Sequence, residues 1–292
     1  MRYHEPLFRP PSEWDSLIIQ VTHGCSWNGC HFCDMYKDKR FSVRSMAALG
    51  RELKTWEGDR EALRIRRIFL ADGNASVLSF DQLKERLVFL KRLFPRLRRV
   101  SMYASPRDLV GKGEDELASL RELGLTRLYV GIESGDDPVL RQNNKGETRD
   151  STLTGALRAQ AAGMDLSVMI LLGLGGRERS VDHIRASADL INRIQPYQLS
   201  LLVLGYPRGL AVYRQRLENP FTPLSLKELL REMNGLLERL SLHRTHFRCD
   251  HGSNFLPLQG VLGRDKKALL ALVDEFDRTV PDSVEPYLPM IG

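Results

Sequence analysis

The chain has 292 residues, of which 42% are hydrophobic and 27% charged, and its formal net charge is +6. This length suffices for one large domain or two small ones, and the composition is typical of a globular protein. No apolar run approaches the length of a membrane-spanning helix, and the polar, proline-broken N-terminus does not resemble a signal peptide. We therefore expect a cytoplasmic protein with no membrane partner.

Strands and helices alternate along most of the chain. After an extended lead-in over residues 1–15, short apolar runs predict strands, and amphipathic spacing predicts helices between them. The expected strands are 16–22, 67–71, 99–104, 126–132, 165–172 and 198–204, and the expected helices are 45–56, 80–94, 114–123, 151–162 and 180–194. This alternation predicts the α/β class, with a helix-covered parallel sheet that is either a barrel or doubly wound.

The pattern changes after Gly205. Residues 206–223 are punctuated by prolines, residues 224–240 and 265–278 have helical spacing, and residues 245–248 favour a short strand. We interpret residues 16–205 as the main α/β domain and residues 206–292 as an α-rich accessory region that closes it. No sharp linker separates the two.

The excess of 43 basic over 37 acidic residues is compatible with a nucleic-acid partner. The densest basic stretch, Lys84 to Arg99, lies on a predicted helix and its exit, and no RNA-binding module can be recognised. A solvated basic face and an RNA-binding surface therefore both stay open as interpretations.

Three of the four cysteines, Cys25, Cys30 and Cys33, lie in one loop after the first predicted strand. Such a trio in a cytoplasmic chain of this size favours a metal site over a disulfide framework. Thiolates suit both zinc and iron-sulfur clusters. Zinc would need a fourth ligand, whereas a cluster held by three cysteines leaves one iron open to a small molecule; the candidates for a fourth zinc ligand are His23, His31 and Asp34.

The other polar and glycine-rich candidates also follow predicted strands. In parallel α/β folds, ligands bind at the carboxyl ends of the strands, where loops and helix N-termini present backbone amides. Asp72-Gly73-Asn74 follows the second strand, Glu133-Ser134-Gly135 the fourth, and residues 173–178 the fifth.

The C-x4-C-x2-C motif, with Phe32 before its last cysteine and the segment YVGIESG at residues 129–135, resembles the radical S-adenosylmethionine (SAM) enzymes. The resemblance covers residues 16–204 and implies a partial (β/α)6 barrel of TIM type, a 4Fe-4S cluster on the three cysteines, and SAM at the open iron. It implies SAM contacts for Phe32, Asp72, Gly73, Asn74, Glu133, Ser134, Gly173 and Gly175. Of these, residues 72–74 would hold the SAM amino group, Glu133 and Ser134 would contact the ribose, and the two later glycines would line the adenine. The commoner family patterns are C-x3-C-x2-C and Gly-Gly-Glu-Pro, so the cysteine spacing and Asp72-Gly73-Asn74 are departures.

The resemblance further implies reductive cleavage of SAM to a 5'-deoxyadenosyl radical, which abstracts hydrogen from a substrate. The reductant would be of flavodoxin or ferredoxin type. The broad group resembled includes tRNA methylthiotransferases, Elongator-type proteins and coproporphyrinogen oxidases, so RNA, a tetrapyrrole or another small molecule is open as substrate. From a different class, the alternative is an iron-sulfur and SAM-binding protein or electron carrier without radical catalysis.

The C-terminal segment 246–260 is rich in polar side chains, and we single out His251 and Asn254 as candidate catalytic residues, beside Arg248 and Asp250. Cys249, the fourth cysteine, is interpreted as an ordinary buried thiol, with a ligand or substrate-facing role as the alternative. A methylthiotransferase would need three further cysteines for a second cluster, which disfavours that reaction.

Overall fold

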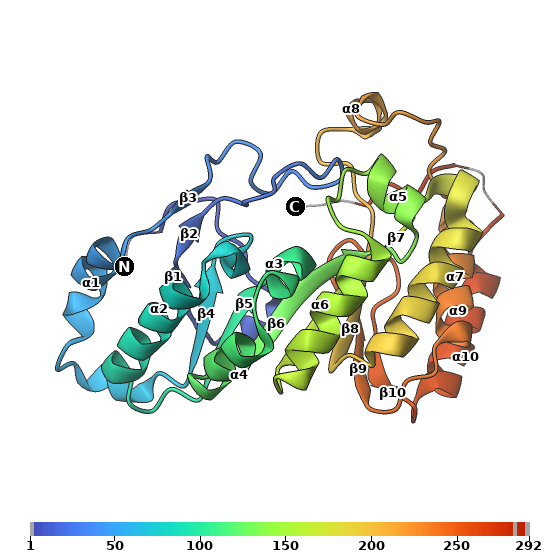
Figure 1. Ribbon diagram of the computed structural model, residues 1–292. Coiled ribbons are helices and arrows are strands. Elements are labelled where there is room, and N and C mark those ends of the chain that lie inside the picture. The colour runs from blue at the N-terminus through green and yellow to red at the C-terminus, as the bar shows by residue number, and fades with distance from the viewer. Residues whose placement is uncertain (1–2, 283–284, 290–292) are drawn as a thin grey trace. The chain divides into compact units, whose positions relative to one another are not determined.

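The computed structural model describes residues 3–282 and 285–289 (Figure 1). Its strands are β1 (Leu17–Gln20), β2 (Thr22–His23), β3 (Ser42–Val43), β4 (Arg67–Ala71), β5 (Arg99–Tyr103), β6 (Leu125–Glu133), β7 (Asp165–Leu172), β8 (Gln198–Val203), β9 (Thr245–Cys249) and β10 (Leu258–Leu262). Its α-helices are α1 (Met46–Leu53), α2 (Phe80–Leu93), α3 (Pro106–Val110), α4 (Glu114–Glu122), α5 (Asp137–Gln142), α6 (Arg149–Ala161), α7 (Gly176–Ile194), α8 (Leu210–Gln215), α9 (Leu226–Arg239) and α10 (Lys266–Thr279).

Internal contacts divide the chain into two units. The first comprises Met1–Asn28, Met35–Val130 and Thr154–Leu166, and the second comprises Gly29–Asp34, Gly131–Leu153 and Ser167–Gly292. This division differs from the predicted boundary between residues 205 and 206, which stays a prediction. The predicted lead-in and accessory region include residues 1–2, 283–284 and 290–292, which lie outside the described residues.

Within the first unit, β1, β4, β5 and the start of β6 pair in parallel. Four of the five residues of β4 are fully buried, as expected for a parallel strand between covered faces. Helix α2 starts at a capping box formed by Ser79 and Gln82, and it buries the predicted apolar side, including Leu83, Leu87 and Leu90.

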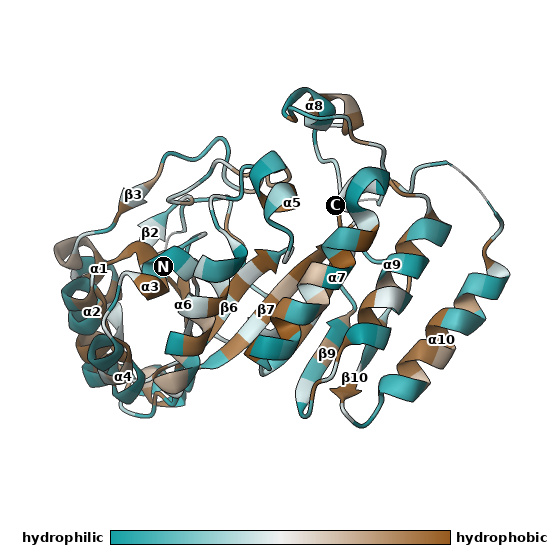
Figure 2. Cartoon of the chain, turned by 45° about the vertical axis from the view of Figure 1, so that its right-hand side comes forward, coloured by the Kyte–Doolittle hydropathy of each residue, from teal (hydrophilic) through white to brown (hydrophobic). Residues whose placement is uncertain are grey.

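Within the second unit, β7 and β8 pair in parallel, β9 joins β8 in parallel, and β10 is antiparallel to β9. Helices α7, α9 and α10 run side by side, and in Figure 2 they carry hydrophilic residues on one side and hydrophobic residues on the other. The strand predicted at residues 245–248 is β9, which extends the sheet, whereas β10 was not predicted. Only two of the five residues of β10 are buried, so this strand lacks a continuous apolar run.

The expected α/β class is confirmed, with mostly parallel strands and helices between them. Strands β4 and β7 have the predicted bounds, and the other predicted elements differ by a few residues at their ends. Three short helices were missed: α3, α5 and α8. Their five or six residues are too few to show a helical apolar period.

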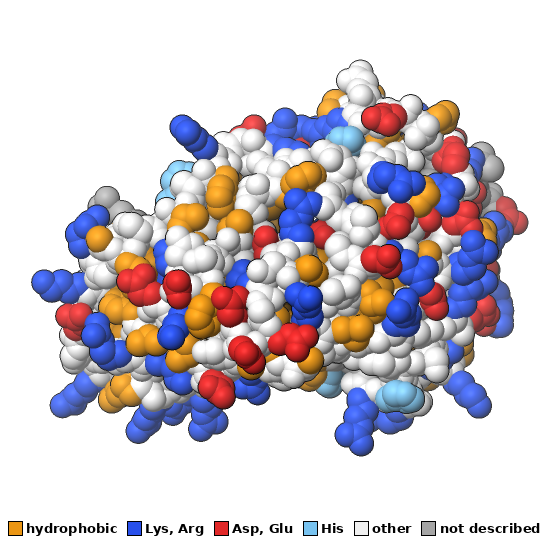
Figure 3. Space-filling view, viewed as in Figure 1, with side chains coloured by type: hydrophobic (Ala, Val, Ile, Leu, Met, Phe, Trp, Pro, Cys, Tyr) orange, Lys and Arg blue, Asp and Glu red, His pale blue; other side chains and the backbone are white. Residues whose placement is uncertain are grey.

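The described helices include none that is long and apolar enough to cross a membrane. In Figure 3, basic and acidic side chains are interspersed over most of the visible face, with Lys and Arg projecting along its lower margin. Two cations of the basic stretch 84–99 face the protein: Arg86 donates to the carbonyl of Arg44, and Arg99 pairs with the buried Glu13 at 3.1 Å. Part of the basic excess is therefore structural.

Gly135 permits a close approach of α7 to the end of β6. A Cβ at Gly135 would lie 2.3 Å from the carbonyl oxygen of Ala186, a backbone atom with little freedom to move. We expect Gly135→Ala to lower the free energy of unfolding by about 3 kcal/mol through overpacking. Gly50→Ala on α1, where nothing lies within 4 Å of the added Cβ, should be neutral or stabilising. Urea unfolding of both variants checks the pair, and equal effects would contradict it.

Candidate active site

The three motif cysteines are free thiols of intermediate exposure. Cys25 belongs to the first unit, whereas Cys30 and Cys33 belong to the second. Among the residues that the structure describes, no three His, Cys, Asp or Glu side chains are gathered so as to hold a metal ion. The assignment of these thiols as ligands therefore rests on the sequence motif, and the structure shows how each part of the loop is held.

In the first unit, the carboxylate of Asp72 holds the segment before Cys25. Asp72 is fully buried and forms an ion pair of 2.7 Å with Lys39, which is also buried. The same carboxylate accepts from the backbone N–H of Gly24 at 2.9 Å and from the amide of Gln20 at 3.2 Å. Asp72 therefore joins both ends of the loop, and its predicted contact with SAM stays a prediction.

The next two residues contact the same segment. The N–H of Gly73 donates to the carbonyl of Gly24 at 3.1 Å, and a Cβ at Gly73 would lie 2.7 Å from the ring of Tyr36 and 3.0 Å from Cys25 Cβ. The side-chain amide of Asn74 donates to Ser26 Oγ at 2.8 Å. Only a glycine fits between Cys25 and Tyr36 without displacing them.

In the second unit, residues 142–145 hold the segment that carries Cys30 and Cys33. His31 N donates to the carbonyl of Asn143 at 2.9 Å, and the ring Nδ1 of His31 lies 3.0 Å from the carbonyl of Gln142. Cys30 Sγ lies 4.0 Å from the carbonyl oxygen of Lys145. These contacts fix the backbone between the two cysteines.

Lys145 places a cation beside these thiols. Its Nζ forms an ion pair of 3.1 Å with Glu133 and lies 5.7 Å from the centre of the Phe32 ring. Burial by itself lowers the pKa of Lys145, but the Glu133 carboxylate and the Cys30 and Cys33 thiols outweigh it, and the net pKa is raised. Lys145 is therefore charged, and it balances negative charge at this end of the unit.

Glu133 and Ser134, the predicted ribose contacts, differ in the hydrogen bonds and ion pairs that their side chains form within the protein. Glu133 has a φ of +64°, a left-handed conformation that is unusual for a non-glycine residue and that turns the chain at the end of β6. Ser134 is fully buried, its Oγ accepts from the N–H of Asp136 at 3.0 Å, and it lies 2.7 Å from His183 Nδ1. The Ser134 hydroxyl is therefore committed within the protein, whereas the Glu133 carboxylate pairs with Lys145.

The loop after β7 is held from the accessory region. The N–H of Gly173 donates to Glu232 Oε2 at 2.7 Å, and burial raises the pKa of Glu232, which lies on α9, to about 7. Gly175 packs at the start of α7, where a Cβ would lie 3.2 Å from the backbone of Arg179. Gly175 thus permits close backbone packing, and Gly173 has a φ of +81°, which favours glycine. The predicted place of both beside the adenine of SAM stays a prediction.

The C-terminal candidates lie on the turn that follows β9. Ser253 N donates to His251 Nδ1 at 3.1 Å, and burial lowers the pKa of His251. Asn254 donates to the carbonyl of Leu201 at 2.8 Å. Cys249 is fully buried, and burial raises its pKa to about 12, so its thiol is neutral and fits the structural interpretation. The catalytic roles of His251 and Asn254 stay predictions.

Lys145, His183 and Glu232 were not predicted as site residues. Each is a single polar residue in an otherwise ordinary stretch. Lys145 lies 12 residues from its partner in the chain, His183 lies 49 residues away, and Glu232 lies 59 residues away. Sequence spacing carries no signal for such contacts. Only the packing of the strands and helices brings the pairs together.

The residues present fit an iron-sulfur cluster and SAM. The donor set is three free thiols, a soft set that suits iron-sulfur clusters. Lys145 supplies positive charge near Cys30 and Cys33. Beside Cys25, residue 73 must be a glycine, because a Cβ there would collide with its neighbours. The chemistry of the donors and the crowding at Gly73 are both compatible with these cofactors.

Comparison with known protein families gives one match that covers more than half of the chain. The model of the radical SAM superfamily matches residues 19–189. The chain belongs to the radical SAM superfamily. Members of this superfamily bind a 4Fe-4S cluster and SAM, which are the cofactors of this chain, and they need a reductant and a substrate.

Individual relatives are distant. The chain is 25% identical to the heme chaperone HemW of Bacillus subtilis (strain 168) over 172 residues, which cover 55% of this chain and 43% of HemW. It thus spans less than half of that relative's length. Coproporphyrinogen III oxidase HemN from Escherichia coli, described as a radical SAM enzyme, aligns with a TM-score of 0.55 and 17% identity over 77% of this chain and 52% of HemN.

A second solved structure has a similar fold. The radical SAM methyltransferase TsrM from Kitasatospora setae, with tryptophan substrate and a SAM analogue bound, aligns with a TM-score of 0.57 and 16% identity over 90% of this chain and 62% of TsrM. At these identities the two structures support the fold alone. The predicted radical SAM fold is confirmed.

Asp72 provides a test of how the loop is held. Asp72→Asn keeps the shape of the side chain but leaves the buried Lys39 without its anion, so we expect a loss of about 3–5 kcal/mol in the free energy of unfolding. Asp15→Asn is the matched control, because Asp15 pairs with Arg67 at 2.8 Å on the surface and should lose less than about 1 kcal/mol. Urea unfolding measures both, and similar losses would contradict the role of Asp72.

His183 predicts a pH dependence. Burial lowers its pKa from 6.5 to about 4. Because the folded-state pKa lies below the ordinary value, the neutral ring stabilises the fold above about pH 6.5, and this contribution is lost as the pH falls toward 4. Between pH 7 and pH 4, we expect the free energy of unfolding to drop about 2–3 kcal/mol further in the wild type than in His183→Asn. Parallel curves for the two proteins would contradict this.

Proposed function

We propose that this protein is a radical SAM enzyme that reductively cleaves SAM and directs the resulting radical at a hydrogen atom of its substrate. The match of the superfamily model to residues 19–189 carries this proposal. When bound, the cluster supplies the electron that breaks the sulfonium C–S bond, giving methionine and a 5'-deoxyadenosyl radical.

The chain's own residues bind and orient these groups. In this proposal Cys25, Cys30 and Cys33 are the three cluster ligands, which leaves one iron for the amino and carboxylate groups of SAM. Lys145 lies beside two of the ligands, and its positive charge favours binding of a carboxylate. Asp72 keeps the first ligand's segment in place through Gly24 and Lys39.

The SAM-binding surface in this proposal follows the ends of the strands. Its residues are Phe32, Asp72, Gly73, Asn74, Glu133, Ser134, Gly173 and Gly175. Since the hydroxyl of Ser134 and the carboxylate of Asp72 already have partners within the protein, we assign these two residues a supporting role. The carboxylate of Glu133 is the side chain best suited to accept from the ribose hydroxyls.

The proposed reductant is a flavodoxin- or ferredoxin-type protein, and the proposed compartment is the cytoplasm. Four free cysteines without a disulfide among the described residues support a reducing compartment. The proposed substrate is either a small molecule, such as a tetrapyrrole, or RNA. We place His251 and Asn254 near this substrate.

A second candidate is a cofactor-binding protein without radical catalysis. The observation in its favour is that the curated relative, HemW, is named as a heme chaperone. Under this alternative the cysteines would still hold a cluster, but no turnover of SAM would follow. Titration with heme under anaerobic conditions tests this alternative directly.

Turnover of SAM separates the two candidates. Anaerobically reconstituted protein with dithionite and SAM should produce 5'-deoxyadenosine. Cys25→Ala, Cys30→Ala and Cys33→Ala should each abolish this product and lower the bound iron, because each removes one cluster ligand. Cys249→Ala, which changes a buried neutral thiol, should keep both. Product quantified by liquid chromatography is the readout; loaded wild-type protein that makes none would favour the binding protein.

A further inference from the structure

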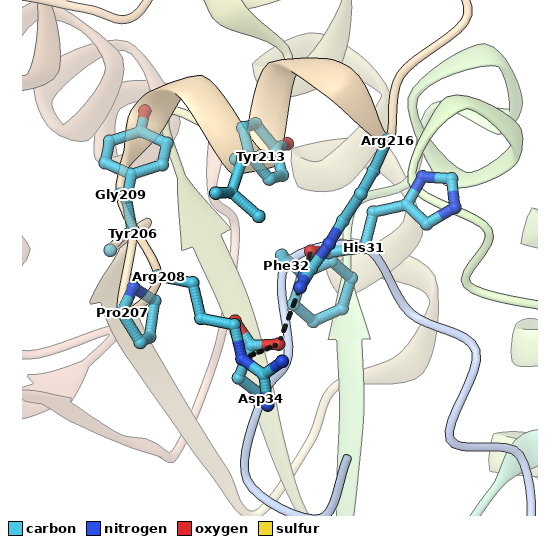
Figure 4. A pocket seen from close by; sticks show the side chains of 11 residues that line it. His31, Phe32, Asp34, Tyr206, Pro207, Arg208, Gly209, Tyr213 and Arg216 are labelled. Atoms are coloured by element: carbon cyan, nitrogen blue, oxygen red, sulfur yellow. Dashed lines mark hydrogen bonds and ion pairs between the residues drawn. The ribbon is translucent and has the colours of Figure 1, made fainter. Parts of the chain in front are cut away.

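Helix α8 ends next to the segment that carries Cys30 and Cys33. Arg216, the residue that follows the helix, reaches this segment with two nitrogens of its guanidinium (Figure 4). Nη1 donates to the carbonyl of His31 at 2.8 Å, and Nη2 donates to Asp34 Oδ1 at 3.0 Å. The two acceptors lie on either side of Cys33 in the chain, so one rigid, planar group fixes the backbone around that cysteine.

The position of Arg216 is fixed by the packing of helix α8 just before it. Tyr213, one turn earlier, is buried in the hydrophobic cluster with Phe221, and their rings meet edge-on at 5.0 Å. The hydroxyl of Tyr213 donates to Asn143 Oδ1 at 2.6 Å. Because the backbone carbonyl of Asn143 accepts from His31 N, α8 and the cysteine segment share one anchor. Helix α8 is thus tied to the segment on two sides.

The space between α8 and the cysteine segment is too small for a ligand. The cavity has a volume of about 10 Å³ and is lined by His31, Phe32, Asp34, residues 205–209, Val212, Tyr213 and Arg216. That is room for about one water molecule. Figure 4 shows the side chains of Arg208 and Arg216 converging on Asp34 in this cavity. The arrangement is therefore a packed contact, which holds the segment, and not a substrate pocket.

Asp34 depends on Arg216 for its charge balance. Its side chain is 11% exposed, and its other arginine, Arg208, is farther away at 3.6 Å and is 44% exposed. A largely buried carboxylate that loses its closer cation moves toward water. Removal of Arg216 would therefore release Asp34 and the carbonyl of His31 together.

We propose that Arg216 is a positioning residue that keeps Cys30 and Cys33 in the conformation that receives the cluster. This inference rests on the proposed function, because it takes these two cysteines as ligands. Under this proposal, the proline-punctuated stretch of residues 206–223 helps to position the cysteine segment. Cys25, which the first unit holds through Asp72 and Gly73, should not depend on Arg216.

The test compares Arg216→Ala and Arg216→Lys with Arg214→Ala as the matched control. Arg214 lies two residues earlier on α8 and donates only to the carbonyl of Phe221 among the hydrogen bonds described. In metal-free protein under reducing conditions, the rate of alkylation by N-ethylmaleimide is measured separately at each cysteine by mass spectrometry. After anaerobic reconstitution, bound iron and the electron paramagnetic resonance signal of the reduced cluster are measured.

Arg216→Ala should raise the alkylation rates of Cys30 and Cys33 about tenfold, the effect expected when charge-assisted hydrogen bonds that close a segment are lost. Cys25 should change less than about twofold, since its partners are intact. Bound iron should fall below about half of the wild-type value. Arg216→Lys should restore part of the protection, because an ammonium can serve one of the two acceptors. Arg214→Ala should behave as the wild type.

Unchanged rates at Cys30 and Cys33 in Arg216→Ala would overturn the proposal. So would an equal rise at all four cysteines with a lower melting temperature, which would mean general destabilisation. If Arg216→Ala does not fold, Asp34→Asn replaces it and should raise the same two rates by a smaller factor. Selective exposure of Cys30 and Cys33 together with a loaded wild type that fails to cleave SAM would support the positioning role and reject the proposed reaction, because alkylation is read without a cluster.

Discussion

The buried ion pair between Lys39 and Asp72 is the interaction on which the two ends of the cysteine loop depend. The cysteine loop between β2 and β3 has no regular secondary structure, so its shape depends on individual contacts, both within the loop and with residues outside it. Burying two charges is costly, and the pair is stable only because further hydrogen bonds, including that from Gly24, complete the carboxylate. Asp72, which directly follows β4, therefore fixes the positions of both ends of the loop.

The second half of the loop follows the same physical rule with different groups. The backbone carbonyls of Gln142 and Asn143 and the guanidinium of Arg216 supply partners to the segment Gly29–Asp34. The loop thus gains order from contacts in both units, each satisfied locally. An irregular loop that is held in this way would lose little conformational entropy if its cysteines bind the cluster, as we propose.

Strain and close packing concentrate at the end of β6. Glu133 adopts a left-handed backbone conformation, Gly135 lies against the backbone of α7, and Ser134 is locked to His183. Such conformations persist only where the surroundings over-determine them. The backbone at Glu133 is therefore fixed by its surroundings, and its carboxylate is held next to Lys145.

The sequence by itself determined the α/β class, the bounds of β4 and β7, and the cysteine motif that led to the radical SAM superfamily. These features are local, since they depend on apolar period and on spacing over a few residues. Only the tertiary structure decided that Asp72 holds Gly24 and Lys39, that Lys145 lies beside Cys30, and that β10 pairs with β9. The contacts of Asp72 and Lys145 join residues that are distant in the chain, and their geometry arises from packing, for which the order of residues carries no local signal. Strand β10 follows β9 closely but lacks a continuous apolar run.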